Sequence, residues 1–244
     1  MILNMASGKV PMTYRGTNTV ALFHFDEPHG STTVTPAVGR GSATLTSGCS
    51  VTSSVYKWNG SLSMTYSSST VRGLSYDDAN CTIGTGPFTV EYFSRMALTS
   101  SSIPSFEISF DNTKTVETSP LTFRYNNSYS SGNGYITAWY IYQYGDTKLS
   151  QSSGLSFSIS TFYHWAIVGD GGASGNRHIA WFFNGSRKFY VSIDYNLPGS
   201  LVTTFYTPTS TPSSYIYLDE LRISNIARYS GTSLTVPSAP FTPD

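Results

Sequence analysis

Residues 179–193 read Ile-Ala-Trp-Phe-Phe-Asn-Gly-Ser-Arg-Lys-Phe-Tyr-Val-Ser-Ile, and this stretch decides the fold class. From Ile179 to Phe183, every second side chain is large and apolar, which gives a β-strand one apolar face. The strand ends at Asn184-Gly185, a pair that tolerates the positive φ values of a type I′ turn. The sequence therefore predicts a β-hairpin whose second strand covers 188–193.

The same two-residue period recurs along the chain, while the longer period of an amphipathic helix is missing. Only Ser224–Tyr229 is expected to form a short helical turn. Many strands separated by turn-rich gaps predict an all-β fold of two antiparallel sheets, a jelly-roll sandwich, rather than a βαβ architecture. The other predicted strands cover residues 20–25, 62–66, 88–93, 106–110, 121–125, 135–144, 163–167 and 215–223.

Composition argues against several classes of protein. Charged residues make up 11% of the chain and aromatic residues 15%, whereas disordered chains are highly charged and poor in aromatics. The 14 basic and 14 acidic residues cancel and no basic block occurs, which argues against nucleic-acid binding. No apolar run is long enough for a transmembrane helix, and the first residues lack the apolar core of a signal peptide. We therefore expect neither membrane insertion nor a signal-peptide route.

The two ends of the chain differ from its middle. Residues 1–16 show no pattern and are expected to form an arm. Residues 230–244 hold three prolines, which favour an extended tail that pairs poorly in a sheet. Residues 17–229 are then expected to form one domain, and the two ends are expected to dock onto a neighbouring molecule.

Five segments that span nearly the whole chain carry a family resemblance: Val20–Asp26, Ile83–Phe93, Phe162–Val168 with Ile179–Gly185, Tyr217–Tyr229 and Pro237–Phe241. In this order they resemble the laminin-G-like, concanavalin A-like jelly-roll domains of bacteriophage tail and virion proteins. The resemblance concerns the fold first, because one fold hosts many functions.

The resemblance implies a virion surface protein with a lectin-like fold, assembled in a host cytoplasm. It would be a capsid decoration, a head fibre or a tail-fibre accessory. The implied partners are other virion proteins, further copies of the same chain and host-surface polysaccharide, since closed homo-oligomers are common in assemblies. The alternative is a dedicated carbohydrate-binding receptor-recognition module of a tail fibre.

Tyrosines are the candidate ligand-binding residues. In the predicted strand 135–144, Tyr140, Tyr142 and Tyr144 share one face, and Trp139 and Ile141 share the other. Tyrosine offers a sugar ring an apolar area and a polar edge. If the tyrosine face points outward, it is a glycan platform or a subunit interface; if the strand is central, both faces are covered.

Two acidic clusters are candidate calcium sites, because calcium takes clustered oxygen ligands. Asp77 and Asp78, with Asn80 close behind, form the first, and Asp26-Glu27 forms the second. The competing interpretation for both is solvated loop carboxylates. No other cofactor is expected.

Asp219 is a different kind of carboxylate. It occurs in the predicted strand 215–223, and strict alternation places it on the same face as Leu221 and Ile223. A carboxylate on an apolar face needs hydrogen-bond partners. We therefore expect a buried structural carboxylate that binds the backbone amides of a neighbouring loop, with metal binding as the alternative.

Catalysis is not expected. Laminarinase-type glycosidases share the implied fold and resemble one another in a Glu-x-Asp-x-x-Glu motif, which this chain lacks. Glu107 and Asp111 come nearest, but their spacing is wrong for a pair of catalytic carboxylates. No Gly-x-Ser-x-Gly elbow occurs, and the histidines lack metal-ligand spacing. Glycoside hydrolysis is therefore the least favoured function.

The two cysteines, Cys49 and Cys81, are too few for a disulfide framework. Buried thiols are expected in a reducing compartment. A disulfide stays open as the alternative if their strands are neighbours.

Overall fold

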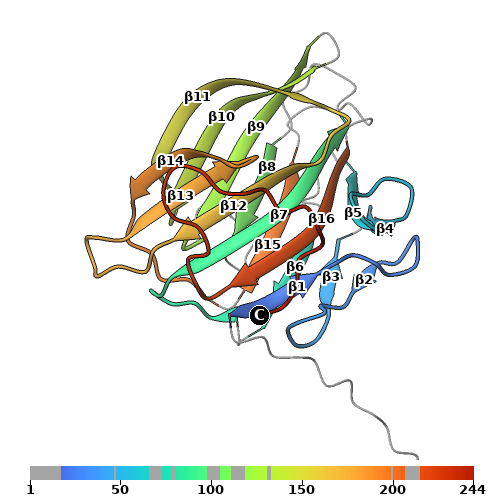
Figure 1. The fold of residues 1–244 in the computed structure, drawn as a ribbon, viewed down its shortest axis with the longest axis horizontal. Coiled ribbons are helices and arrows are strands. Elements are labelled where there is room, and N and C mark those ends of the chain that lie inside the picture. The colour runs from blue at the N-terminus through green and yellow to red at the C-terminus, as the bar shows by residue number, and fades with distance from the viewer. Residues whose placement is uncertain are drawn as a thin grey trace, which may run out of the picture.

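The computed structural model describes residues 18–46, 48–65, 73–78, 81–97, 105–110, 119–130, 133–198, 200–206 and 215–244. Every named element in these ranges is a β-strand, and the strands form two antiparallel sheets packed face to face, as predicted (Figure 1). The described residues contain no helix long and apolar enough to cross a membrane. The expected N-terminal arm, 1–16, lies outside the described residues.

Sheet A has the strand order β14-β13-β12-β7-β16-β5-β4, with β1 paired to β16, and forms the front layer in Figure 1. The predicted hairpin joins its strands β13 and β14, and the turn residues Asn184 and Gly185 have φ values of +45° and +86°. The strands of sheet A are β1 (Thr19–Phe23), β4 (Cys49–Thr52), β5 (Ser61–Thr65), β7 (Phe88–Ala97), β12 (Tyr163–Gly169), β13 (His178–Phe183), β14 (Ser186–Ser192) and β16 (Tyr215–Ser224).

Sheet B lies behind sheet A in this view and has the order β11-β10-β9-β8-β15-β6-β3-β2. Its long strands β9, β10 and β11 extend one end of the molecule (Figure 1). The strands of sheet B are β2 (Thr33–Val34), β3 (Ala43–Leu45), β6 (Leu74–Asp77), β8 (Ser105–Ser109), β9 (Thr122–Ser130), β10 (Asn133–Gln143), β11 (Asp146–Ser158) and β15 (Ser200–Tyr206).

The core lies between the two sheets and is rich in aromatic side chains. Trp165 of sheet A stacks on Tyr125 of sheet B, with ring centroids 4.2 Å apart and planes within 6° of each other. Trp139 of sheet B meets Trp181 of sheet A edge to face at 4.9 Å. Such pairs add to the free energy gained from burying the rings, and here they join one sheet to the other.

A β-bulge in β16 corrects one prediction. Asp219 pairs with Phe93, but the next paired residue is Arg222, opposite Glu91, and Glu220 has a φ of +54°. The extra residue reverses the alternation of faces along the strand. Leu221 therefore points into the core, whereas Asp219 lies on the outer face of sheet A, so the shared face expected for these two residues is wrong.

The helical turn predicted for Ser224–Tyr229 is also wrong. Strand β16 continues to Ser224, and the residues after it form bends and irregular chain. The hydroxyl of Thr89 donates to the carbonyl of Ile226 at 2.8 Å and accepts from the amide of Arg228 at 3.0 Å. One side chain from β7 thus binds the backbone groups that a helical turn would have used.

The C-terminal segment packs against its own domain. It crosses the outer face of sheet A as the dark red trace in Figure 1. Phe241 is 4% exposed within an apolar cluster on this face. The main-chain oxygen of Asp244 accepts hydrogen bonds from the amides of Asn18 and Thr19 at the start of β1. The C-terminal segment, which the sequence predicts to be an extended tail, therefore packs against the domain itself through these residues. Its docking onto a neighbouring molecule stays a prediction.

Candidate functional site

The outer face of sheet B carries two of the predicted tyrosines. Trp139 and Ile141 of β10 are buried between the sheets, whereas Tyr140 and Tyr142 on the other face of the strand are half-buried. Their rings are parallel to within 13°, and the ring centroids are 5.7 Å apart. This face of β10 is therefore partly open to solvent.

Charged and hydroxyl side chains surround this pair. The register places Arg124 of β9 opposite Tyr140, and Glu107 of β8 opposite Arg124. Arg124 forms an ion pair with Glu107, and its guanidinium lies 5.2 Å from the ring centroid of Tyr142. On the other side, Ser150 of β11 pairs with Tyr140. Glu107, Arg124, Tyr140 and Ser150 thus form one row across four strands.

The phenol of Tyr142 is suited to hydrogen bonding. Burial raises the pKa of Tyr142 above its ordinary value, although Arg124 opposes the shift. The hydroxyl therefore stays protonated at neutral pH and is a donor as well as an acceptor. Its register partners Thr122 and Thr147 extend the row of hydroxyl-bearing residues.

Tyr144 lies apart from this pair, at the turn between β10 and β11. Tyr144 and Gly145 have φ values of +49° and +81°, as the central positions of a type I′ turn require. The side chain of Tyr144 is 59% exposed. The structure thus brings Tyr140 and Tyr142 together on the sheet and places Tyr144 at the end of the strand.

The first candidate calcium site has a structural use for one of its carboxylates. Asp78 is buried, and its Oδ2 accepts hydrogen bonds from the amide of Arg40 at 2.8 Å and the hydroxyl of Tyr76 at 3.0 Å. Asp77 is exposed. Asn80, the third residue of the predicted cluster, lies outside the described residues. Among the residues that are described, no three His, Cys, Asp or Glu side chains gather closely enough to hold a metal ion.

In the second acidic pair, Asp26-Glu27, the carboxylate of Glu27 has a structural role. Glu27 accepts a hydrogen bond from the amide of Thr35 at 2.7 Å.

Cys49 and Cys81 are buried thiols that no disulfide joins. Burial raises the pKa of Cys81 to about 12, so its thiol is a poor nucleophile at neutral pH.

Asp219 holds a loop against sheet A. Its Oδ2 accepts hydrogen bonds from the amides of Lys57 and Trp58, at 2.8 and 3.3 Å. Its Oδ1 is buried, and no described residue bonds to it. Burial raises the pKa of Asp219 to about 7, although the two amides oppose the shift. The carboxyl group therefore organises backbone and is shielded from solvent.

A buried ionic cluster on the outer face of sheet A is a feature that sequence reasoning missed. Glu91 is fully buried; its Oε1 accepts from Arg222 at 2.9 and 2.7 Å, and its Oε2 from Tyr229 at 2.6 Å. His164 lies 3.2 Å from Oε2. Burial opposes ionisation, but these partners outweigh it and lower the pKa of Glu91. The cluster is closed to solvent, so it stabilises the fold and offers no catalytic carboxylate.

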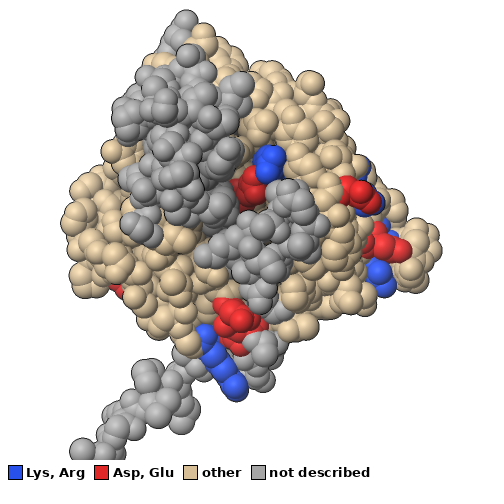
Figure 2. Space-filling model, turned by 180° about the vertical axis from the view of Figure 1, so that it is seen from behind, with Lys and Arg blue, Asp and Glu red and all other residues tan. Residues whose placement is uncertain are grey.

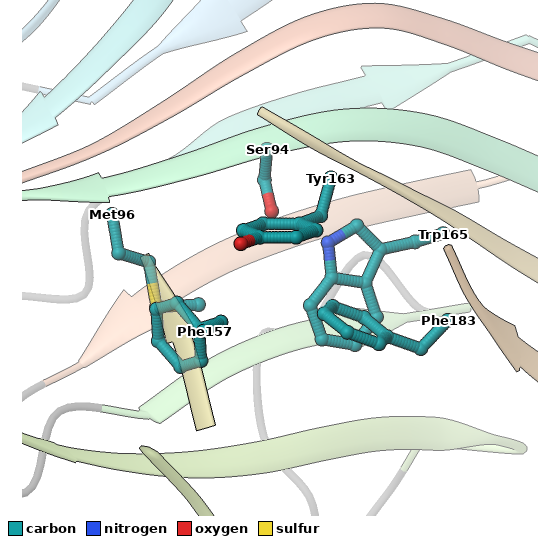
Figure 3. Close-up of a pocket in the computed structure, with 6 residues that line it drawn as sticks. All are labelled: Ser94, Met96, Phe157, Tyr163, Trp165 and Phe183. Carbon is teal, nitrogen blue, oxygen red and sulfur yellow. The ribbon is translucent and has the colours of Figure 1, made fainter. Parts of the chain in front are cut away.

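A small pocket opens between the sheets beside the aromatic core (Figure 3). Its volume is about 10 Å³, room for a single water molecule at most, and it is lined by Ser94, Met96, Phe157, Tyr163, Trp165 and Phe183. Figure 3 shows the indole nitrogen of Trp165 and the hydroxyl of Ser94 on the same side, next to the ring of Tyr163. The lining holds no carboxylate or imidazole, so the pocket has no acid–base chemistry.

The comparisons with known proteins show likeness at the level of the fold. No protein-family model matches the chain, and no curated protein sequence matches it. The receptor-binding domain of botulinum neurotoxin type G superposes with a TM-score of 0.56 at 14% identity, over 87% of this chain and 49% of that one. The binding domain of paraclostridial mosquitocidal protein 1 gives 0.56 at 13%, over 87% and 50%.

A further solved structure is that of a complex. The binding domain of botulinum neurotoxin DC in complex with SialylT superposes with a TM-score of 0.54 at 10% identity, over 86% of this chain and 48% of that one. The chain thus spans about half the length of these domains. At such identities the likeness shows the all-β sandwich fold alone, and it assigns no ligand to this chain.

Proposed function

We propose that this protein is a non-catalytic glycan-binding module that recognises a surface polysaccharide through the outer face of sheet B. The observation that carries the proposal is the pair of parallel, half-exposed rings of Tyr140 and Tyr142 beside the Arg124–Glu107 ion pair. Aromatic rings pack against the apolar C–H groups of sugars, and the paired charges and hydroxyls bind sugar hydroxyl groups.

The charge distribution supports a neutral or weakly charged polysaccharide on this face. Figure 2 views the molecule from the side of sheet B, and its described surface is mostly uncharged, with acidic and basic residues in small separate groups. Arg124 is already paired with Glu107, so the row offers no excess charge. Directional hydrogen bonds therefore supply the specificity.

A non-catalytic role is consistent with the described carboxylates. Hydrolysis of a glycosidic bond uses two carboxyl groups that flank the sugar. On this face Glu107 is held by Arg124, and Asp111, whose spacing from Glu107 is already wrong for a catalytic pair, lies outside the described residues. Glu91 and Asp219 are buried under the C-terminal segment and a loop.

We further propose that the module is carried on the surface of a phage particle, as a capsid decoration, head fibre or tail-fibre accessory, and assembles with copies of itself. This placement rests on the five sequence segments that resemble phage laminin-G-like domains. Peptide mass spectrometry of purified particles, together with light scattering on the isolated protein, tests it. Absence from the particles would contradict the virion placement without touching glycan binding.

A glycan array tests the binding function. The wild-type protein is expected to bind a restricted set of polysaccharides, and Tyr140→Ala/Tyr142→Ala is expected to weaken binding roughly tenfold, the loss of two aromatic contacts. Tyr140→Phe/Tyr142→Phe separates the contribution of the rings from that of the hydroxyls.

The chain offers a matched control. Tyr215 and Tyr217 of sheet A are also parallel, at 6.2 Å and 11°, and Arg95 lies 5.9 Å from the ring of Tyr217. Tyr215→Ala/Tyr217→Ala should leave glycan binding unchanged. A blank array, or equal losses in the two alanine variants, would contradict the proposal.

A further inference from the structure

A groove lies on the outer face of sheet A, on the opposite side of the molecule from Tyr140 and Tyr142. Its volume is about 200 Å³, which is smaller than the roughly 300–1,000 Å³ of typical small-ligand sites. Its floor is apolar and consists of Val168, Ala180 and Phe182 from β12 and β13. Ala180 lies on this face between its larger register partners Val168 and Tyr190.

The groove is fixed by the C-terminal segment. Ala227, Tyr229, Ser230 and Gly231 line one side of it. They are held in place because the amide of Arg187 donates to the carbonyl of Thr232 at 3.0 Å and the amide of Leu234 to that of Gly185 at 2.8 Å. Backbone hydrogen bonds to β14 and to the turn before it therefore preform the groove, and a ligand need not order it.

A histidine of defined tautomer lies at one rim. The Nδ1 of His178 is 3.0 Å from Oδ2 of Asp170, and an ionised carboxylate only accepts hydrogen bonds, so Nδ1 carries the proton. Burial raises the pKa of Asp170, but hydrogen bonds from the His178 and Gly172 amides outweigh it and keep the carboxyl ionised. With the proton on Nδ1, the Nε2 of the imidazole is an acceptor, suited to a ligand hydroxyl.

A cation also lines the groove. The guanidinium of Arg187 lies 4.8 Å from the ring centroid of Tyr190, whose ring stacks on His178 at 4.7 Å and 8°. No carboxylate among the described residues forms an ion pair with Arg187, and the only carboxylate that lines the groove is Asp170, whose oxygens are already bonded. The positive charge is therefore available to an anion.

We infer that this groove is a second binding site, for a carboxylate-bearing saccharide. The carboxylate of the sugar pairs with Arg187, a ring hydroxyl donates to Nε2 of His178, and the apolar face of the ring lies on Val168, Ala180 and Phe182. The exposed residues Tyr190 and Ser230, which bear hydroxyls, also line the groove. An acceptor nitrogen beside a cation suits a ligand that has both hydroxyls and a carboxylate better than a bare anion.

Calorimetric titration with a panel of uronic acid and sialic acid oligosaccharides, each compared with its own methyl ester, tests the inference. At least one acid is expected to bind, and its ester is expected to bind more than tenfold more weakly. Arg187→Gln should lower the affinity for the acid by roughly tenfold or more, the loss of a charge-assisted hydrogen bond. The ester has the same ring without the charge, so the comparison isolates the carboxylate.

The control is Arg95→Gln, which removes an arginine that also lies beside a tyrosine on sheet A but does not line the groove. It should bind the acid as the wild type does. The inference is overturned if no acid binds, if acid and ester bind equally, or if Arg187→Gln binds normally. Equal binding of a glutamate oligopeptide would overturn the assignment to a saccharide. Because Tyr140 and Tyr142 lie on the other sheet, either site can fail without the other.

Discussion

At the scale of single residues, Asp219 makes the stability of the fold depend on pH. Its Oδ2 receives two loop amides, while its Oδ1 is buried with no described partner, so the proton resides most favourably on Oδ1. The pKa rises from 3.8 to about 7 because burial penalises the ionised form. A carboxyl group with a raised folded-state pKa stabilises the fold at low pH and loses this contribution as pH rises.

The first prediction concerns Asp219→Asn. The amide oxygen can still accept the Lys57 and Trp58 hydrogen bonds, but the side chain cannot ionise. The free energy of unfolding of the wild type, relative to this variant, should therefore fall between pH 4 and pH 7, the window set by the unfolded and folded pKa values. Chemical denaturation of both proteins at a series of pH values measures this difference. A constant difference across the window would contradict it.

The second prediction concerns the buried ion pair of Glu91 and Arg222. Glu91→Gln leaves the Arg222 guanidinium buried without a counter-charge, so it should cost about 3–5 kcal/mol of unfolding free energy. Asp146→Asn is the control: the carboxylate of Asp146 is 79% exposed and pairs with Lys148 at 3.4 Å, so its loss should cost less than about 1 kcal/mol. Similar losses in the two variants would contradict a structural role for the cluster.

At the scale of elements, the C-terminal segment packs in a fixed position on the outer face of sheet A. Phe241 packs with Leu22, Val38 and Phe93, and its amide donates to Oε2 of Glu220 at 2.8 Å. The same segment covers Glu91 and forms one side of the groove. Loss of this packing should therefore lower the free energy of unfolding and also disrupt the second binding site.

The third prediction follows from this packing. Phe241→Ala should lower the free energy of unfolding by about 3–5 kcal/mol, the usual cost of deleting a buried phenylalanine ring. Thr242→Ala, at the exposed neighbouring position, should leave stability nearly unchanged. Denaturant titration checks both. A Phe241→Ala protein as stable as the wild type would show that the packing of the C-terminal segment does not stabilise the fold.

Strands differ in how far the sequence predicts them. The β13–β14 hairpin is predicted correctly because alternation and a turn pair lie within one short stretch. Strand β11 (Asp146–Ser158) was not predicted, because serine, threonine and glycine dominate it and most of its residues are exposed. The strand forms because it pairs with β10, and no sequence pattern within residues 146–158 predicts that pairing. No local sequence pattern predicts the bulge at Glu220 either, and this bulge places Asp219 on the opposite face of the strand from Leu221.

At the scale of the whole molecule, the fold was predictable and the sites only partly. Two aromatic-cored antiparallel sheets follow from the repeated two-residue period. The tyrosine pair follows from alternation in one strand, but its Arg124 and Glu107 neighbours depend on the register of three strands. The groove joins β12–β14 to residues 227–231, and no periodic pattern links segments so distant in the chain.

The central claim is that a glycan contacts the outer face of sheet B. The most direct test is nuclear magnetic resonance of the tyrosine ring signals, assigned by single Tyr→Phe variants, while a polysaccharide identified on the array is added. The account predicts saturable shifts of the Tyr140 and Tyr142 signals, with Tyr215 and Tyr217 unchanged. Shifts confined to Tyr215, Tyr217 or other tyrosines, with Tyr140 and Tyr142 unmoved at saturation, would contradict it.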